Sequence, residues 1–328
     1  MRPTIVVIIS LFLMVSSKVE DFSTAHAIES PVFSQALPGY TYQFPKDFYS
    51  HDDFRIEWWY YTGNLEAIET ARPFGYQLTF FRVALNNKNA SPNQSQWKLG
   101  HVYFAHMTLT DVDGEKFYYF ERINRKGVGN AGADADRLMV WNDDWFLEGK
   151  GKVHLLKAIE SGTGVELQLV PEKKLVIHGN NGISQKGSEK GNASHYFSYT
   201  RMKTTGQIFV RGKAYNVLGS SWMDHEYSSN QLNDELVGWD WFSLKLDDQT
   251  ELMLYLLRHK TGGVDSFSSG TFIAANGSSR HIKQEEFIIR PLSYWTSKKS
   301  GIVYPASWEL ELPDLGIELT LSPDLNEQ

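Results

Sequence analysis

The chain has 328 residues, and 32 Lys and Arg against 39 Asp and Glu give it a net charge of −7. This acidic balance argues against a nucleic-acid-binding protein, which normally presents a basic face. The absence of cysteine excludes disulfides, thiolate nucleophiles and cysteine-bound zinc. Aromatic residues make up 14% of the chain, and because they favour strands and line apolar pockets, they predict a β-rich protein.

The N-terminus has the features of a secretory signal. Arg2 precedes an apolar run over residues 5–15, which is shorter than the roughly 20 residues that a membrane span needs. An Ala-x-Ala cleavage site ends at Ala27. These features predict a signal peptide over residues 1–27. We therefore expect an exported protein, periplasmic or secreted, with no stable membrane span after cleavage.

The rest of the chain alternates apolar and polar residues in short runs bounded by Gly, Asn and Asp, which is typical of strands. The predicted strands cover residues 57–65, 76–84, 101–112, 116–121, 164–170, 195–202, 239–246, 251–259, 307–312 and 316–321. Many short strands joined by turns predict antiparallel sheets that close into barrels or sandwiches.

One pattern occurs twice. Glu57 and two aromatic residues begin a predicted hairpin whose second strand ends at Arg82, and Asp240 with two aromatic residues begins another that ends at Arg258. A repeated supersecondary unit predicts two related β-domains. We place them at residues 28–213 and 214–328.

Asp240 is a candidate general acid. Strand alternation puts Asp240 on an apolar face with Phe242, whereas Trp239 and Trp241 occupy the opposite face. Burial of a carboxyl raises its pKa and lets it donate a proton near neutral pH. The alternative is a structural carboxylate that pairs with an arginine, since structural networks also perturb pKa values.

A second group of candidates lies just upstream. If the segment is extended, Trp222, Asp224 and Glu226 share one face, and His225 points away. Two carboxylates on one face separate into an acid and a base, and a histidine can orient a partner or shuttle protons. The alternative is a solvated turn without chemistry.

The first repeat offers a further acid among aromatic side chains. Glu57 shares a face with Trp59, whereas Trp58 and Tyr60 lie on the other. Such rings are most often core, but they also line cavities and stabilise a passing cation.

Another aromatic and polar strand contains Tyr196 and Arg201. Arg201 fits either a clamp for a carboxylate or phosphate or a structural salt bridge. The candidate substrate-binding residues are therefore Trp58, Trp59, Tyr60, Tyr196, Arg201, Trp222, Trp239 and Trp241.

Several sequence motifs are absent. The chain has no G-x-S-x-G, no H-E-x-x-H, no Walker loop and no dinucleotide fingerprint, and its ten histidines lack metal-ligand spacing. We therefore expect neither a metal nor a cofactor.

Several segments carry a family resemblance. They include residues 57–65, 78–82, 198–201, 219–226 and 238–242, with His178–Gly179 between them. Together they resemble the AttH-like and carotenoid 1,2-hydratase family. The resemblance implies two lipocalin-like antiparallel β-barrel domains, and it implies relatives that add water to an isoprenoid double bond.

Two functions follow as hypotheses. In the first, a cofactor-free hydratase uses Asp240 or Asp224 to protonate a C=C bond of an apolar, isoprenoid-like substrate between the domains. Glu226 or His225 then activates the attacking water, and the Trp rings stabilise the carbocation. In the second, a lipocalin-like carrier binds a hydrophobic small molecule without converting it. A lipid or ester hydrolase ranks last, because no nucleophile motif is present.

Overall fold

The computed structural model describes residues 33–85, 100–126, 129–230, 235–298 and 300–326. The predicted signal peptide lies outside these residues. The described chain is built of antiparallel strands, with short 3-10 turns such as η1 (Lys46–Phe48), so the all-β prediction is confirmed. Within the described residues, no helix has the length and apolar character needed to cross a membrane.

A large antiparallel sheet forms the first unit, in the order β4-β3-β2-β1-β13-β12-β9-β8-β7-β6-β5, and β10 and β11 also pair with β12. Its strands are β1 (Ile56–Ala67), β2 (Pro73–Ala84), β3 (His101–Asp111), β4 (Lys116–Arg125), β5 (Ala131–Ala133), β6 (Met139–Asn142), β7 (Trp145–Lys150), β8 (Val153–Glu160), β9 (Thr163–Pro171), β10 (Val176–Ile177), β11 (Ser184–Gln185), β12 (Ala193–Val210) and β13 (Lys213–Asn230).

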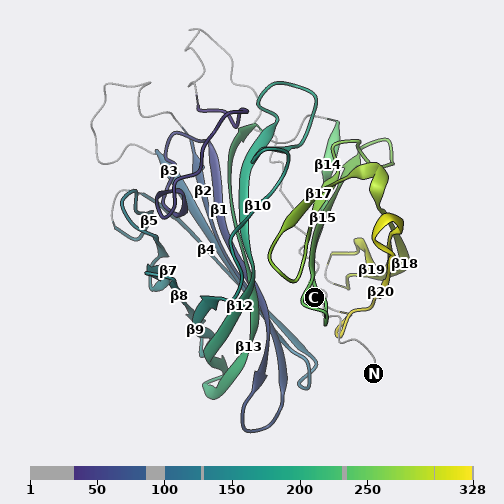
Figure 1. Ribbon diagram of the computed structural model, residues 1–328. Helices are drawn as coiled ribbons and strands as arrows, with labels where there is room; N and C mark the ends of the chain where they lie inside the picture. The colour runs from purple at the N-terminus through teal and green to yellow at the C-terminus, as the bar shows by residue number, and fades with distance from the viewer. Residues whose placement is uncertain (1–32, 86–99, 127–128, 231–234, 299, 327–328) are drawn as a thin grey trace.

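The sheet curls until its two ends meet (Figure 1). Asn124 on β4 donates its amide to Asn142 on β6 across 2.7 Å, and Arg122 on β4 reaches the carbonyl of the same Asn142 at 3.1 Å. The result is a nearly closed barrel. Side chains of alternate residues, such as Trp59, Leu78 and Met107, fill its interior.

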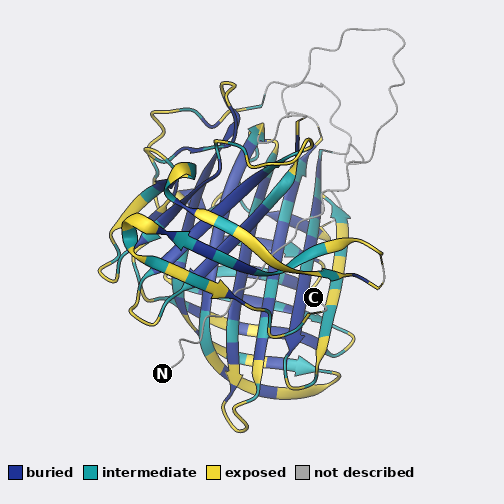
Figure 2. Ribbon diagram, turned by 90° about the vertical axis from the view of Figure 1, so that its right-hand side faces the viewer, coloured by how far each residue is buried: buried dark blue, intermediate teal, exposed yellow. Residues whose placement is uncertain are grey.

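The second unit consists of two smaller sheets. One has the order β14 (Leu236–Lys245), β15 (Glu251–His259), β16 (Ser269–Ile273) and β17 (Ser279–Lys283). The other comprises β18 (Ile288–Thr296), β19 (Val303–Leu312) and β20 (Ile317–Leu321). Figure 2, in which this unit faces the viewer, shows exposed residues in yellow along the front of the molecule and buried strands behind it.

The second unit differs from the closed barrel that the family resemblance implies. After β17 the chain turns through η3 (Gln284–Glu286) and starts a new ladder instead of extending the first one. The two sheets bury one apolar cluster, which includes Phe242, Leu254, Trp308 and Leu310. Two sheets therefore share a core without closing on each other.

The boundary between the two units lies later in the chain than residue 214, where the repeated pattern predicted the second domain to begin. β13 follows that position, and it pairs with β1 and β12 of the large sheet along most of its length. A strand held on both sides by ladder hydrogen bonds belongs to that sheet. The last strand of the large sheet therefore ends at Asn230, and the first strand of the second unit begins at Leu236.

Both hairpins of the repeated pattern are present. In the β1–β2 hairpin, Glu57 lies directly opposite Arg82, and the two side chains form an ion pair of 3.0 Å. In the β14–β15 hairpin, Asp240 lies opposite Leu256, and its side chain reaches diagonally to Arg258, two residues further along β15, at 3.3 Å. The repeat thus places one acid–arginine pair on the inward face of each unit.

A third apolar cluster joins the units. Tyr60, Tyr196 and Trp222 on the outer face of the barrel pack against Trp241 and Tyr255 of the four-stranded sheet. The rings of Tyr60 and Trp241 meet edge to face at 5.5 Å, an arrangement that aromatic pairs prefer. This interface positions the candidate site.

Candidate functional site

The segment around Asp224 forms part of β13, not a surface turn. Trp222, Asp224 and Glu226 alternate with inward-pointing neighbours and so face the second unit. The register places Asp224 opposite Tyr60 and Glu226 opposite Trp58 on β1. Two carboxyls and several large rings therefore share the interface.

The carboxyl of Asp224 is held by three donors. Its residue is 4% exposed. The indole Nε1 of Trp222 donates to Oδ1 at 2.7 Å, the Tyr196 hydroxyl does so at 3.0 Å, and the Ser198 hydroxyl donates to the same oxygen. Burial raises the pKa of Asp224 to about 7, although these hydrogen bonds act in the opposite direction. The carboxyl therefore retains its proton at a higher pH than an ordinary aspartate does.

A buried chain of hydrogen bonds continues from Asp224. His178 Nε2 lies 2.7 Å from the Ser198 hydroxyl, and His178 Nδ1 lies 2.8 Å from the Thr271 hydroxyl on β16. Burial lowers the pKa of His178 to about 3, so the ring is neutral. Because Ser198 donates to Asp224, the consistent tautomer donates from Nε2 to Ser198 and accepts at Nδ1 from Thr271.

A pocket lies beside this chain. It encloses about 30 Å³ and is lined by Trp58, Lys186, Tyr196, Glu226, Trp239, Trp241, Tyr255 and Leu257. The Tyr196 hydroxyl receives a hydrogen bond of 3.2 Å from Trp241 Nε1 and donates to Asp224. Tyr196 therefore connects the buried acid to the pocket.

The lining of the pocket also includes a cation, Lys186. Lys186 Nζ lies 3.4 Å from Glu226 Oε1 and 3.9 Å from the centre of the Tyr255 ring. Burial opposes the charge of this lysine, but Glu226 and Tyr255 outweigh it and raise the pKa of Lys186. The ammonium therefore stays charged and fixes Glu226 at the edge of the pocket.

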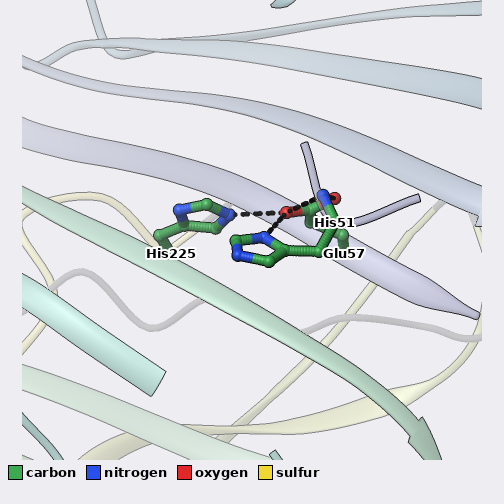
Figure 3. A group of neighbouring side chains, drawn as sticks. All are labelled: His51, Glu57 and His225. Carbon is green, nitrogen blue, oxygen red and sulfur yellow. Dashed lines mark hydrogen bonds and ion pairs between the residues drawn. The ribbon is translucent and has the colours of Figure 1, made fainter. Parts of the chain in front are cut away.

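Glu57 and His225 lie inside the barrel, away from the pocket. Figure 3 shows the Glu57 carboxylate between His51 and His225, at 2.7 Å and 2.9 Å from their ring nitrogens. Arg82 binds the other oxygen at 3.0 Å. Although burial disfavours the charge, Glu57 and Asp47 raise the pKa of His51 to about 9, so this ring is protonated.

The three side chains in Figure 3 are ligand types that a metal ion uses, and their ligand atoms lie within 4.8 Å of one another. However, the Arg82 guanidinium and the protonated His51 already match the charges of Glu57 and Asp47. This cluster is therefore a charge-balanced buried ion network. Sequence spacing did not reveal it, because Glu57 and His225 lie on different strands.

Comparison with known proteins identifies the family to which the chain belongs. The AttH-like family profile matches residues 35–328. The chain belongs to the AttH-like family. A crystal structure of a candidate AttH protein from Nitrosomonas europaea is 30% identical, with a TM-score of 0.81, and the match covers 90% of this chain and 88% of that one. No curated protein matches the sequence.

A second solved structure shares the fold of this AttH-like chain at lower identity. Kievitone hydratase from Nectria haematococca is 12% identical, with a TM-score of 0.63, and the match covers 92% of this chain and 85% of that one.

The AttH-like chain does not bring Asp240 to the pocket. Asp240 lies on the face of β14 that packs with Phe242 into the core of the second unit, whereas Trp239 and Trp241 line the pocket from the other face. Burial raises the pKa of Asp240, and Arg258 opposes this shift. Asp240 therefore forms a structural ion pair.

Four predicted binding residues also lie outside the lining of the pocket. Trp59 points into the barrel and donates its Nε1 to the Phe48 carbonyl at 3.1 Å. Tyr60 and Trp222 pack in the interface, where Trp222 holds Asp224. Arg201 forms an ion pair of 2.7 Å with Glu251 at a distance from the aromatic pocket.

The raised pKa of Asp224 makes the stability of this AttH-like protein depend on pH. The folded protein binds the proton with a pKa of about 7, against about 3.9 for an ordinary aspartate, so the protonated carboxyl favours the folded state. This contribution is complete below about pH 4 and is lost as the pH rises to about 7. The free energy of unfolding of the wild type should therefore fall relative to that of Asp224→Asn over this range.

Urea unfolding at a series of pH values measures this difference. If the free energy of unfolding changes with pH in the same way for the wild type and Asp224→Asn, then Asp224 titrates in its ordinary range. This result would contradict the expected rise of its pKa.

Proposed function

We propose that this AttH-like protein is a cofactor-free hydratase that protonates a C=C bond of an apolar, isoprenoid-like substrate. The observation that carries the proposal is the Asp224 carboxyl, which is buried, retains a proton near neutral pH and is linked through Tyr196 to an aromatic pocket. A carboxyl with a pKa close to the working pH is well suited to general acid catalysis. The fold shared with kievitone hydratase is compatible with this chemistry.

The proton has a short path to the pocket. When Asp224 is protonated, its O–H can donate to the Tyr196 oxygen, which frees the Tyr196 hydroxyl hydrogen to turn toward the pocket. Tyr196 then passes a proton to one alkene carbon while it takes the proton of Asp224. A C–H bond forms, the π bond breaks, and the other carbon becomes a cation.

The rings around the pocket suit that cation. Trp58, Trp239 and Trp241 line the pocket with their indole rings. A cation over an aromatic face gains about 0.5–2 kcal/mol, and tryptophan is the best of the three aromatic residues. Because the charge exists only after protonation, this attraction lowers the barrier without tightening ground-state binding.

Glu226 is placed to complete the reaction. It lies at the pocket edge, held by Lys186, and accepts a proton from the water that attacks the cation. A C–O bond forms, Asp224 has lost one proton and Glu226 has gained one, and exchange with solvent restores both. The net reaction adds one water to the double bond.

The enclosed space limits how the substrate enters. About 30 Å³ holds roughly two water molecules, since one needs at least 10–15 Å³ by this measure. Trp58 and Trp239 are only partly buried. We expect these two rings to move when the reacting end of the substrate enters.

Incubation with isoprenoid alkenes in water labelled with ¹⁸O tests the proposal. We expect an alcohol product that carries one labelled oxygen. Absence of label from all the alkenes offered, with folded protein, would contradict the assignment as a hydratase.

A carrier of a hydrophobic small molecule is the second candidate. The ion pair between Glu226 and Lys186 favours it, because the ammonium group already occupies the carboxylate that the hydratase reaction would use. Export through a signal peptide at residues 1–27, which we also propose, suits a carrier as well. Solvent extraction of the purified protein followed by mass spectrometry separates the two functions. An unchanged ligand in a one-to-one ratio indicates a carrier, whereas accumulating product indicates the enzyme.

A further inference from the structure

A second hollow lies where the end of β14 meets the barrel. Its volume is about 240 Å³, and it is lined by Asn64, Arg201, Ser220, Lys245, Leu246, Asp247 and Gln249. Leu246 is the only apolar residue among them. Ser220 precedes Glu226 by six residues on β13, so the hollow lies roughly 20 Å from the aromatic pocket. The proposed hydratase reaction uses none of these residues.

Lys245 brings a cation to this hollow. Its Nζ donates to the Ser220 carbonyl at 2.9 Å and to the Ser220 hydroxyl at 3.1 Å. Both of these acceptors are neutral. An ammonium group has three N–H donors, so one remains available to a ligand.

Arg201 supplies a second cation from the barrel. Its Nε binds Glu251 at 2.7 Å and its Nη2 donates to the Leu246 carbonyl at 3.3 Å. Glu251 also binds Lys173 at 2.8 Å. One buried carboxylate is therefore shared by two cations, and the guanidinium, with five N–H donors, still has donors to offer.

The surroundings of Lys245 are electrostatically unfavourable for its charge. Burial and the nearby Arg201 lower the pKa of Lys245 to about 7, although Glu251 and Glu172 act in the opposite direction. Asp247, the remaining charged residue of the lining, is exposed. An anion placed between the two cations would relieve this repulsion.

We propose that the hollow binds a small oxyanion, such as a carboxylate, sulfate or phosphate group, between Lys245 of the second unit and Arg201 of the barrel. The side-chain amides of Asn64 and Gln249 and the Ser220 hydroxyl supply further hydrogen-bond donors around the same space. Charge-assisted hydrogen bonds of this type are stronger than neutral ones. The bound anion also connects β14 to the barrel.

Titration of the full chain with sulfate, and separately with succinate, tests the site by calorimetry. The variant Lys245→Gln removes the charge and retains a polar side chain. The matched control is Lys152→Gln, an exposed lysine in the turn before β8. We expect one anion per chain in the wild type and in the control, and affinity at least about tenfold lower in Lys245→Gln, as loss of a charged hydrogen bond predicts.

The pH dependence gives an independent readout. Sulfate keeps its charge near neutral pH, so wild-type affinity should fall as the pH rises through about 7 and Lys245 loses its proton. Lys245→Gln should show no such fall. If Lys245→Gln does not fold, Asn64→Leu replaces it and should weaken binding too. No binding at millimolar anion, or equal binding by the wild type and the folded variant, would overturn the proposal.

Discussion

Replacing Asp224 with Asn should lower the rate of hydration by about 10²- to 10⁴-fold, the usual contribution of a positioned general acid. Asn keeps the oxygen that accepts hydrogen bonds from Trp222, Tyr196 and Ser198. It has no acidic proton to pass to Tyr196, however, so the change removes the chemistry while it preserves the packing. Label incorporation from ¹⁸O water measures the rate.

Asp240→Asn is the matched control for this prediction. Asp240 is also a buried carboxyl with a raised pKa, but it lies on the far face of β14 and pairs with Arg258. We expect Asp240→Asn to retain the hydration rate to within a few-fold. Equal loss of activity in both variants would show that the loss comes from destabilisation of the protein and not from the missing proton donor. An Asp224→Asn variant with the wild-type rate would show that Asp224 does not supply the proton.

The largest effect on stability should come from Glu57→Gln in the barrel interior. Glu57 and Arg82 are both fully buried, and the neutral side chain would leave Arg82 and the protonated His51 without their main counter-charge. Removing one partner of a buried ion pair costs about 3–5 kcal/mol. For a protein of this size such a loss lowers the melting temperature by roughly 5–8 °C, which calorimetry measures.

Glu309→Gln provides the comparison for this change. Glu309 pairs with Arg290 at 3.1 Å on the surface of the second unit, where solvent screens the charges. The melting temperature of the Glu309→Gln variant should stay close to that of the wild type. A Glu57→Gln variant that melts like the wild type would mean that the network in Figure 3 contributes little to folding.

Alternation of side chains along β13 was sufficient to predict that Trp222, Asp224 and Glu226 share a face. It was not sufficient to identify the hydrogen-bonded chain through Ser198, His178 and Thr271, because these residues come from separate strands and meet only through tertiary packing. The one signal for His178 in the sequence was its place in the family resemblance.

The position of Asp240 shows a second limit of sequence patterns. The alternation correctly separated Asp240 from Trp239 and Trp241, but both faces of β14 are apolar. A strand that is buried on both sides does not indicate which face meets the barrel. The pattern therefore left open whether the acid or the indole rings would face the aromatic pocket.

The resemblance also implied a second closed barrel. The alternation of apolar and polar residues predicts where strands lie. It does not predict which strands pair, so hydrogen-bonded pairing can stop between two consecutive strands that have the same alternation. The break between β17 and β18 therefore depends on the turn at η3 and on the packing of Trp308 against Phe242, at 5.2 Å between ring centres.

The most direct test of the account is a pH titration of the Asp224 carboxyl by ¹³C NMR, with Asp224→Asn to assign the signal. The buried, hydrogen-bonded position predicts an apparent pKa of about 7. A carboxyl that is fully ionised by about pH 5, as an ordinary aspartate is, would contradict the proposal that Asp224 supplies the proton.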